Sequence, residues 1–495
     1  MNYISTRGGS DGKVSAAQAI KQGLASDGGL FMPENIPSLD TQEIAELCEM
    51  SYHERAAYIL SRFLTDYSYE ELLEDCQAAY SEERFPGGAA PIHKLDERRF
   101  VLELWHGPTS AFKDMALQIM PKLLSRALEK TGEERTALIL VATSGDTGKA
   151  ALEGYRDVPG VKIMVFYPVD GVSKVQKLQM ATQLGENVSV YAIEGNFDDA
   201  QTGVKKIFGD AALASELNNR NVFLSSANSI NWGRLAPQIV YYVSAYCDLI
   251  NAGEIYAGEM INVTVPTGNF GNIFAAFIAK RMGVPINRLV CASNRNNILT
   301  DFLATGTYDR NRKFYTTMSP SMDILISSNL ERLLYVMSGC EKTSDYMKRL
   351  NESGCYTIDD ELKAKLAEHF TGFFCNEKET SSTIKRTFVK KGYLIDTHTA
   401  VGVNCADKYM EQNNDGLKML IASTASPYKF ASDVYASLTG VTPEDGLEAL
   451  KELTKLSGVE IPYPLKDIDK REVRFKDIIK KEEMPEKVTD FALKK

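Results

Sequence analysis

The sequence lacks the cysteine and histidine patterns that would assign it to a metal-binding or disulfide-linked class. Its eight cysteines are scattered and form no C-x-x-C pair, so neither a disulfide framework nor a thiolate zinc site is indicated. The five histidines include no H-E-x-x-H, the spacing of a zinc peptidase helix. We therefore expect no bound metal, and a reducing, cytoplasmic location.

Positive charge and long apolar runs are also missing. The 495 residues carry a formal net charge of −10, which argues against nucleic acid or a membrane surface as a partner. No apolar stretch approaches the ~20 residues that span a bilayer, and the N-terminus shows no signal-peptide core. With 44% hydrophobic and 25% charged residues, the composition is that of a globular protein, and the length predicts two or three domains.

A helical N-terminal segment precedes a region in which strands and helices alternate. Two amphipathic helical stretches, 41–64 and 68–83, lead to a Gly/Pro-rich linker at 85–91. The alternation that follows predicts an α/β fold with parallel sheets. The apolar stretches expected to form strands are 98–104, 136–142, 161–168, 186–193, 261–266, 287–294 and 417–424. We expect an N-terminal domain over 1–90, a catalytic region over 91–440, and a helical tail over 441–495 whose charged residues face solvent.

Two of these strands lead into turns suited to an anion. "VTVPTGNFGN" ends a strand at Pro266 and places Gly268 and Gly271 before a helix, so backbone N–H groups and the helix N-terminus can form a nest for phosphate. "ATSGDTGKAA" offers the hydroxyls of Ser144 and Thr147 at an equivalent position, where a carboxylate or phosphate can bind. An ordinary strand-to-helix turn and simple N-capping are the alternatives.

Two further stretches carry polar groups in similar places. In "SSANSINWGRLAPQ", Arg234 lies one turn into a helix behind Ser229 and Asn231, where a guanidinium can hold a phosphate. A helix cap plus a surface arginine is the alternative. "LIASTASPYKF" ends a strand with Ser423 and Thr424. Ligands of open parallel sheets lie beyond the carboxyl ends of the strands, which favours a ligand at all four stretches.

A lysine completes the set. In "HGPTSAFKDMALQ", Lys113 stands beside Phe112 where an amphipathic helix begins, so burial and the helix dipole both oppose its charged form. An amine destabilised in this way can form a Schiff base; the alternative is an ammonium group that reaches solvent. A phosphate nest, a lysine and hydroxyl-bearing turns together indicate pyridoxal phosphate as a cofactor.

The motifs resemble those of the threonine synthase family, pyridoxal-phosphate enzymes of fold type II, in its longer, N-terminally extended subclass. "GLFMPENIP" near the N-terminus and "TASPYKF" near the end extend the resemblance from about residue 1 to about residue 440. It implies two α/β domains of largely parallel, twisted sheet plus an N-terminal, mainly helical extension. It also implies that Lys113 holds the cofactor covalently, that Thr424 bonds its ring nitrogen, and that its phosphate is bound by Gly268, Asn269, Phe270, Gly271 and Asn272.

The resemblance also implies a substrate site. Ser144 and Thr147 would hold the substrate carboxylate, and Arg234, with Ser229 or Asn231, would hold its phosphate. Asp146 corresponds to an asparagine that some relatives place near the cofactor's 3-oxygen, and an anion beside a phenolate is repulsive, so its role stays open. Two departures from the family pattern are Thr397, which replaces a common proline and suggests a difference in loop rigidity, and Lys174, which either supports phosphate binding or is a surface residue.

The implied reaction converts O-phospho-L-homoserine and water to L-threonine and phosphate, by γ-elimination and β-addition of water, in a monomer or homodimer. A related phospho-lyase or hydroxy-amino-acid dehydratase would keep Lys113 and the phosphate nest but release a keto acid and ammonia. A binding protein that retains the fold without catalysis is a third hypothesis, and it predicts no covalent link at Lys113.

Overall fold

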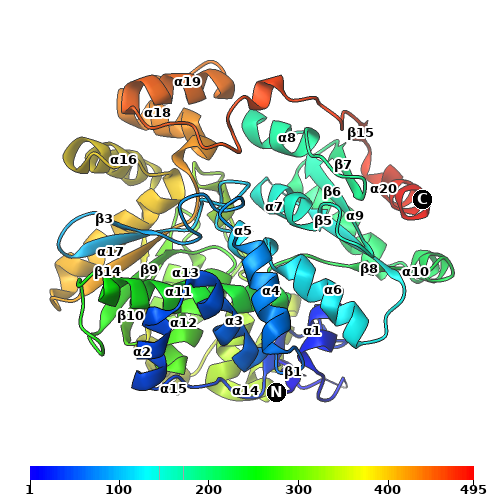
Figure 1. Cartoon of the computed structure of the whole chain (residues 1–495), viewed down its shortest axis with the longest axis horizontal. Helices are drawn as coiled ribbons and strands as arrows, with labels where there is room; N and C mark the ends of the chain where they lie inside the picture. Colours follow the sequence, from blue (N-terminus) through cyan, green and yellow to red (C-terminus); the bar gives the residue numbers. More distant parts are fainter. Residues whose placement is uncertain (10, 144, 171, 495) are drawn as a thin grey trace.

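Two largely parallel sheets lie side by side in the computed structural model (Figure 1), which describes residues 1–9, 11–143, 145–170 and 172–494. The larger sheet has six strands in the order β13-β10-β9-β14-β4-β3, and only the β3–β4 pair is antiparallel. Its strands are β3 (Ile92–Lys94), β4 (Arg99–Glu103), β9 (Ile261–Pro266), β10 (Ile286–Ser293), β13 (Phe370–Phe374) and β14 (Lys418–Ser423). The expected α/β fold with parallel sheets is confirmed.

The smaller sheet has five strands, all parallel, in the order β15-β7-β6-β5-β8. Its strands are β5 (Thr136–Ala142), β6 (Val161–Pro168), β7 (Val188–Ile193), β8 (Val222–Ser225) and β15 (Ile478–Ile479). The bounds of β5 and β6 coincide with the apolar runs of the sequence. β8 and β15 were not expected, because the first has only four residues, two of them half-buried, and the second is a two-residue edge strand in a charged tail.

Both sheets are covered by helices on their two faces, which explains why their strands are apolar throughout. In the smaller sheet, Ile139 and Ile163 face the main core while Leu140 and Met164 pack into a separate cluster on the other side, as the two-residue repeat of a strand requires. Helix α7 (Asp146–Tyr155) covers the first face and α9 (Phe197–Gly209) the second. In the larger sheet, α12 (Gly271–Met282) covers the face toward the main core and α17 (Thr397–Asn413) covers the opposite face.

The N-terminal segment is helical, as expected, and packs beneath the larger sheet (Figure 1). It contains α1 (Ala16–Gln22), α2 (Thr41–Glu49), α3 (Tyr52–Phe63), α4 (Tyr69–Ala79) and the antiparallel pair β1 (Tyr3–Ser5) and β2 (Phe31–Pro33). The stretch 41–64, expected as one helix, is two, because Ser51 caps a new helix with Glu54 in a capping box. Buried Arg55 joins this segment to α11 (Trp232–Asn251) through Asp248, at 2.6 Å.

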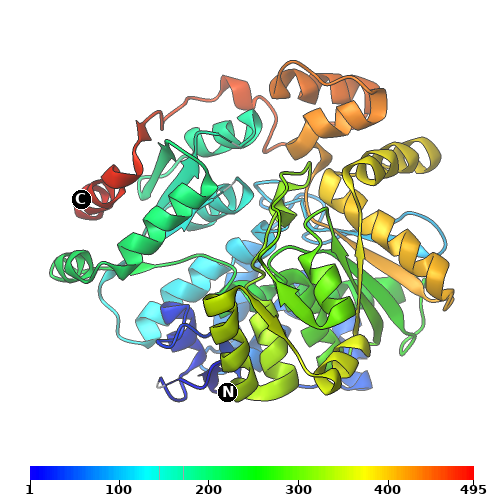
Figure 2. The same ribbon diagram turned by 180° about the vertical axis from the view of Figure 1, so that it is seen from behind.

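The remaining helices fill the periphery, and the C-terminal tail is more than a solvated surface. Residues 484–493 form α20, which lies beside the smaller sheet (Figure 2). Its Met484, Val488 and Phe491 are buried in one cluster with Leu140 and Met164 of that sheet. The charged residues of this helix, Glu486, Lys487 and Asp490, are exposed or half-buried, as expected, whereas its apolar residues recur at every third or fourth position and form a buried face that was not expected. The other helices are α5 (Asp114–Leu117), α6 (Met120–Lys130), α8 (Lys174–Ala181), α10 (Ala211–Asn218), α13 (Ile298–Thr305), α14 (Leu330–Ser353), α15 (Asp360–Ala367), α16 (Glu377–Lys391), α18 (Ala431–Thr439) and α19 (Gly446–Ser457).

The mainly helical stretch between β10 and β13 contains a small antiparallel strand pair, β11 (Thr307–Asp309) and β12 (Cys355–Thr357). No helix in the described parts of the chain is both long enough and apolar enough to cross a membrane. The carboxyl ends of β4, β5, β8, β9 and β14 each lead into one of the motifs singled out above, and the side chains described next come from those strand ends.

Candidate active site

A tight turn between β4 and α5 fixes the position of Lys113. Asp114 accepts hydrogen bonds from the backbone N–H and the hydroxyl of Thr109, at 2.8 and 2.7 Å. Ser110 adopts a left-handed conformation with φ 59°, an uncommon one for a residue with a side chain. The Phe112 N–H donates to the Thr424 carbonyl at 2.8 Å. Lys113 therefore stands at the N-cap of α5, and the turn ties it to the strand end that carries Thr424.

The Lys113 ammonium lies in a poorly solvated place, as the sequence predicts. Its side chain is 12% exposed, and its Nζ lies 5.3 Å from the centre of the Phe112 ring. Desolvation lowers the pKa of Lys113 to about 8; the nearby Asp146 carboxylate opposes this shift, while the positive charges of Arg234 and Lys429 add to it. About half of the amine is therefore neutral and nucleophilic near pH 8.

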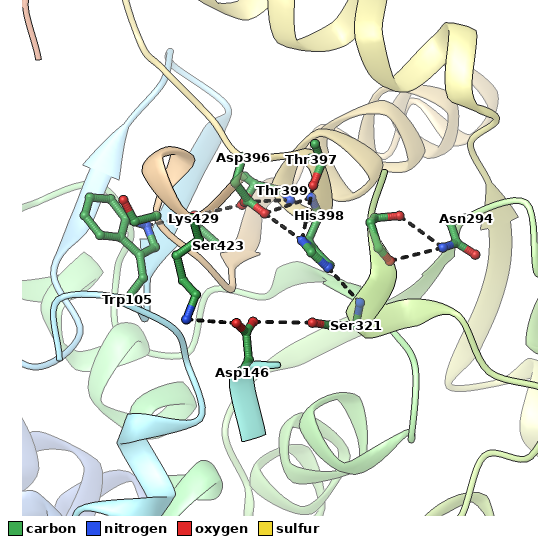
Figure 3. A network of polar contacts seen from close by, with 12 residues as sticks. Trp105, Asp146, Asn294, Ser321, Asp396, Thr397, His398, Thr399, Ser423 and Lys429 are labelled. Atoms are coloured by element: carbon green, nitrogen blue, oxygen red, sulfur yellow. Dashed lines mark hydrogen bonds and ion pairs between the residues drawn. The ribbon is translucent and has the colours of Figure 1, made fainter. Parts of the chain in front are cut away.

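Asp146 opens α7 and forms the centre of a charged cluster (Figure 3). Its carboxylate lies 2.8 Å from Lys429 Nζ and 3.8 Å from Lys113 Nζ, and Gln176 donates to it at 2.9 Å. Burial raises the pKa of this carboxyl, but Lys429 and Lys113 outweigh burial and hold it well below its usual range. The repulsion expected between this anion and a cofactor phenolate is thus reduced by a fixed counter-charge that the sequence analysis did not identify.

The loop between β9 and α12 has the form of the expected anion nest. Phe270 takes a left-handed conformation with φ 62° just before the helix begins at Gly271, and a Cβ at Gly268 would lie 2.8 Å from the Ser321 carbonyl. Asn272 accepts hydrogen bonds from the hydroxyls of Tyr241 and Tyr242. Its buried amide nitrogen has no partner among the described residues. An unpartnered donor beside a helix N-terminus fits a phosphate group.

The end of β14 offers one hydroxyl for a ring nitrogen. Ser423 is already engaged: its oxygen accepts from the Trp105 indole at 3.0 Å, and it contacts the Thr399 hydroxyl at 2.8 Å (Figure 3). Thr424 is 5% exposed, and within the described residues its hydroxyl makes no hydrogen bond. Of the two side chains, Thr424 is thus the one left to meet a cofactor, as the resemblance implies.

Arg234 is a buried cation without a carboxylate partner among the described residues. It is 5% exposed, one of its terminal nitrogens donates to the Ala227 carbonyl at 2.7 Å, and its Nε has no partner. Desolvation lowers the pKa of this guanidinium to about 10. Buried charges are normally paired, so the arrangement fits an anionic ligand better than the alternative of a surface arginine.

The other expected substrate contacts differ in how the structure places them. Asn231 caps α11 by accepting from the Gly233 N–H at 2.9 Å and donates to the Ile20 carbonyl at 2.8 Å, so both ends of its amide are occupied within the protein. Ser229 is half-buried and Thr147 lies half-buried in the first turn of α7. Ser144 lies outside the described residues. Lys174 pairs with Asp445 at 2.6 Å on the surface, which places it away from a phosphate.

A second polar chain, not identified from the sequence, holds the short helix η1 (Pro320–Met322) against this site. Asp396 accepts from His398 Nδ1 at 2.8 Å, and His398 Nε2 accepts the Ser321 N–H at 3.2 Å. The Ser321 hydroxyl in turn lies 3.4 Å from Asp146 (Figure 3).

Thr397, which stands where relatives commonly have proline, is the first residue of α17. Proline is common at this first helical position, so the interpretation of Thr397 as a difference in loop rigidity was wrong.

The fold and the site define a pyridoxal-phosphate-dependent enzyme. The family model described as pyridoxal-phosphate dependent enzyme matches residues 87–424, the span that contains Lys113, the phosphate nest and Thr424. Two further models match either side of it: the threonine synthase N terminus over residues 2–80, and the threonine synthase C-terminal region over residues 399–491. The chain belongs to the threonine synthase family.

Individual relatives agree with this membership. Threonine synthase of Pseudomonas aeruginosa is 38% identical, over 90% of this chain and 92% of its own length. Human threonine synthase-like 1 is 42% identical over 86% of this chain, and the match spans 58% of that longer relative. The crystal structure of pyridoxal-phosphate-bound threonine synthase from Brucella melitensis has a TM-score of 0.88 and 36% identity, and the match covers all of both chains.

Proposed function

We propose that the chain converts O-phospho-L-homoserine and water to L-threonine and phosphate. The observation that carries the proposal is that the site offers two separate places for a phosphate group. One is the nest at the start of α12, where the Asn272 amide nitrogen has no hydrogen-bond partner in the described parts of the chain. The other is buried Arg234 in the first turn of α11, which pairs with none of the described carboxylates. The first suits the cofactor and the second a phosphorylated substrate.

In this proposal Lys113, Thr424 and the loop 268–272 hold the cofactor. When bound, pyridoxal phosphate supplies a conjugated ring that takes up negative charge from the substrate's α-carbon. The Lys113 amine has a pKa of about 8, so it can accept a proton at the α-carbon and return one near neutral pH. Lys113 is thus assigned the proton transfers of the reaction.

Arg234, Thr147 and Ser144 are assigned to the substrate. The Arg234 guanidinium would hold the phosphate until the bond from the γ-carbon to oxygen breaks, and its charge would then stabilise the departing anion. The N-terminus of α7, with the Thr147 hydroxyl, would hold the carboxylate. Thr147 and Arg234 follow strands of the smaller sheet, whereas the cofactor loop 268–272 follows β9 of the larger sheet. A substrate bound between the cofactor and these groups would therefore draw the two sheets together and exclude water until it is needed at the β-carbon.

Product analysis with O-phospho-L-homoserine tests the proposal. We expect threonine and inorganic phosphate in equal amounts. A lyase built on the same scaffold would instead release 2-oxobutanoate, ammonia and phosphate. Keto acid without threonine would overturn the proposed reaction while leaving the cofactor site intact.

We also propose a cytoplasmic location and a monomeric or homodimeric state. All eight cysteines are free thiols, and six of them are buried, which suits a reducing compartment. Fractionation of the source cells and light scattering of the purified protein test these two points. Enrichment in an oxidising compartment, or a larger assembly, would contradict them.

A further inference from the structure

Lys429 is a buried lysine whose contacts all lead to the candidate active site. It lies in the short helix η2 (Pro427–Phe430), a few residues beyond Thr424. Its side chain is fully buried, and its Nζ is 2.8 Å from Asp146 Oδ1 and 2.9 Å from the carbonyl oxygen of Thr109. It thus links the start of α7, which follows a strand of the smaller sheet, to the turn that positions Lys113.

Asp146 is approached from four different elements. Lys429 reaches it from η2, Lys113 from the start of α5, Gln176 from α8, and Ser321 from η1. The carboxylate is 3% exposed, so water does little to screen it. Two ammonium groups therefore share one buried carboxylate, and the Lys429 contact is the shorter by 1 Å.

The two lysines differ in their contacts and in the chemistry proposed for them. Lys113 loses its proton near pH 8, and the proposed chemistry requires it to exchange protons and bonds. If Lys113 were the only counter-charge, Asp146 would become an unpaired buried anion at each such step, which is strongly unfavourable. Lys429 makes the shorter contact, bonds a backbone carbonyl as well, and has no role in bond formation.

We propose that Lys429 is a positioning residue that keeps the Asp146 carboxylate paired and fixed in direction, so that Lys113 can change its charge beside it. The Asp146–Lys429 pair is neutral overall, and it presents a carboxylate oxygen where an amide oxygen would otherwise stand. The inference rests on the proposed role of Lys113 and goes beyond it, because it assigns the electrostatic partner of Asp146.

The proposal differs from that of a simple brace between two parts of the fold. A brace affects stability, whereas a shared counter-charge also sets the proton affinity of Lys113. The charged groups that act on Lys113 are Asp146, Arg234, Lys429 and Asp114. Removing the Lys429 cation should make Lys113 hold its proton more tightly. Removing the Asp146 anion should make Lys113 hold its proton less tightly, since only the smaller effect of Asp114 then opposes Arg234 and Lys429.

Trace acetylation with acetic anhydride, on the full chain freed of cofactor, measures this proton affinity directly. The rate at which Lys113 is acetylated is followed by peptide mass spectrometry from pH 6 to pH 11. We expect a midpoint near pH 8 for the native chain. Lys429→Met should raise the midpoint by about one pH unit and Asp146→Asn should lower it by about as much. The double variant should return close to the native value.

Lys149→Met is the matched control. Lys149 is also a buried lysine paired with a carboxylate, Glu153 at 3.2 Å, and it lies on the same helix as Asp146. This variant should lose stability without moving the Lys113 midpoint. If Lys429→Met does not fold, Lys429→Gln keeps a donor for Asp146 and should show the same upward shift.

Midpoints that move in the same direction in both single variants, or that stay at the native value, would overturn the proposal. So would a double variant that fails to restore the native midpoint. Because acetylation needs no substrate turnover, a failure of Lys429 in this role and a failure of the proposed reaction are separate results.

Discussion

Replacing Lys113 by methionine should stabilise the cofactor-free chain at neutral pH. The two side chains are similar in length, and Asp146 keeps Lys429 as its partner at 2.8 Å. Burial lowers the pKa of Lys113 from its ordinary 10.5 to about 8, which corresponds to about 3 kcal/mol of unfavourable free energy for the charged form in the folded state. Methionine does not carry this charge, so we expect a gain of up to about 3 kcal/mol at pH 7.

The dependence on pH makes this prediction specific. Below pH 8 both the folded and the unfolded native chain hold the Lys113 proton, and the folded state bears the whole unfavourable term. Between pH 8 and 10.5 the folded chain has released a proton that the unfolded chain still binds, so native stability rises with pH. The advantage of Lys113→Met should therefore shrink over this interval.

Urea unfolding at pH 7 and pH 10, followed by circular dichroism, provides the measurement. The exposed Lys378 serves as a control, since Lys378→Met should change stability by only a few tenths of a kcal/mol at either pH. A Lys113→Met chain that is less stable than the native chain at pH 7, or a difference that does not vary with pH, would refute the reasoning about burial.

Three further substitutions test other parts of the site. Arg234→Met leaves none of the described carboxylates unpaired, so the chain should fold normally. KM for O-phospho-L-homoserine should rise about 10- to 100-fold from the loss of charged hydrogen bonds, and an unchanged KM argues against Arg234 as the phosphate ligand. Gly268→Ala places a Cβ 2.8 Å from the Ser321 carbonyl, so the loop must shift and cofactor affinity should fall, as equilibrium dialysis would show; native affinity would mean that the loop absorbs the methyl group. Thr424→Ala should keep the covalent link at Lys113 but weaken cofactor binding about 5- to 10-fold, and an unchanged affinity and absorption spectrum would count against Thr424.

The sequence was most informative where local patterns decide structure. Apolar runs at 136–142, 161–168 and 261–266 became β5, β6 and β9 with the same bounds, since buried parallel strands are apolar on both faces. The turns after β9, with Gly268 and Gly271, and after β4, with Lys113, were also predicted. At these positions the apolar pattern changes from that of a strand to that of a helix. The sequence did not predict where helices are interrupted. The stretch after Lys113 has one helical pattern, but the structure divides it at Gln118 and Ile119 into α5 and α6.

The long-range contacts could not be predicted from the sequence. Lys429 belongs to the motif "TASPYKF", yet its partner Asp146 lies far earlier in the chain, and only the two-sheet fold brings them to 2.8 Å. Likewise, nothing in the sequence distinguishes His398 from the polar residues around it. Its hydrogen bond from the Ser321 backbone N–H depends on where η1 lies in the fold. The same applies to β15, whose two residues pair with Ala192 and Ile193 without a pattern of their own.

The covalent state of Lys113 tests the central claim most directly. The full chain, loaded with pyridoxal phosphate, is treated with borohydride, which converts an imine to a stable amine, and its peptides are then mapped by mass spectrometry. We predict the reduced cofactor on Lys113 and on no other lysine, and its loss in Lys113→Met. Stoichiometric cofactor on a different lysine, or none after full loading, would contradict the account of the site.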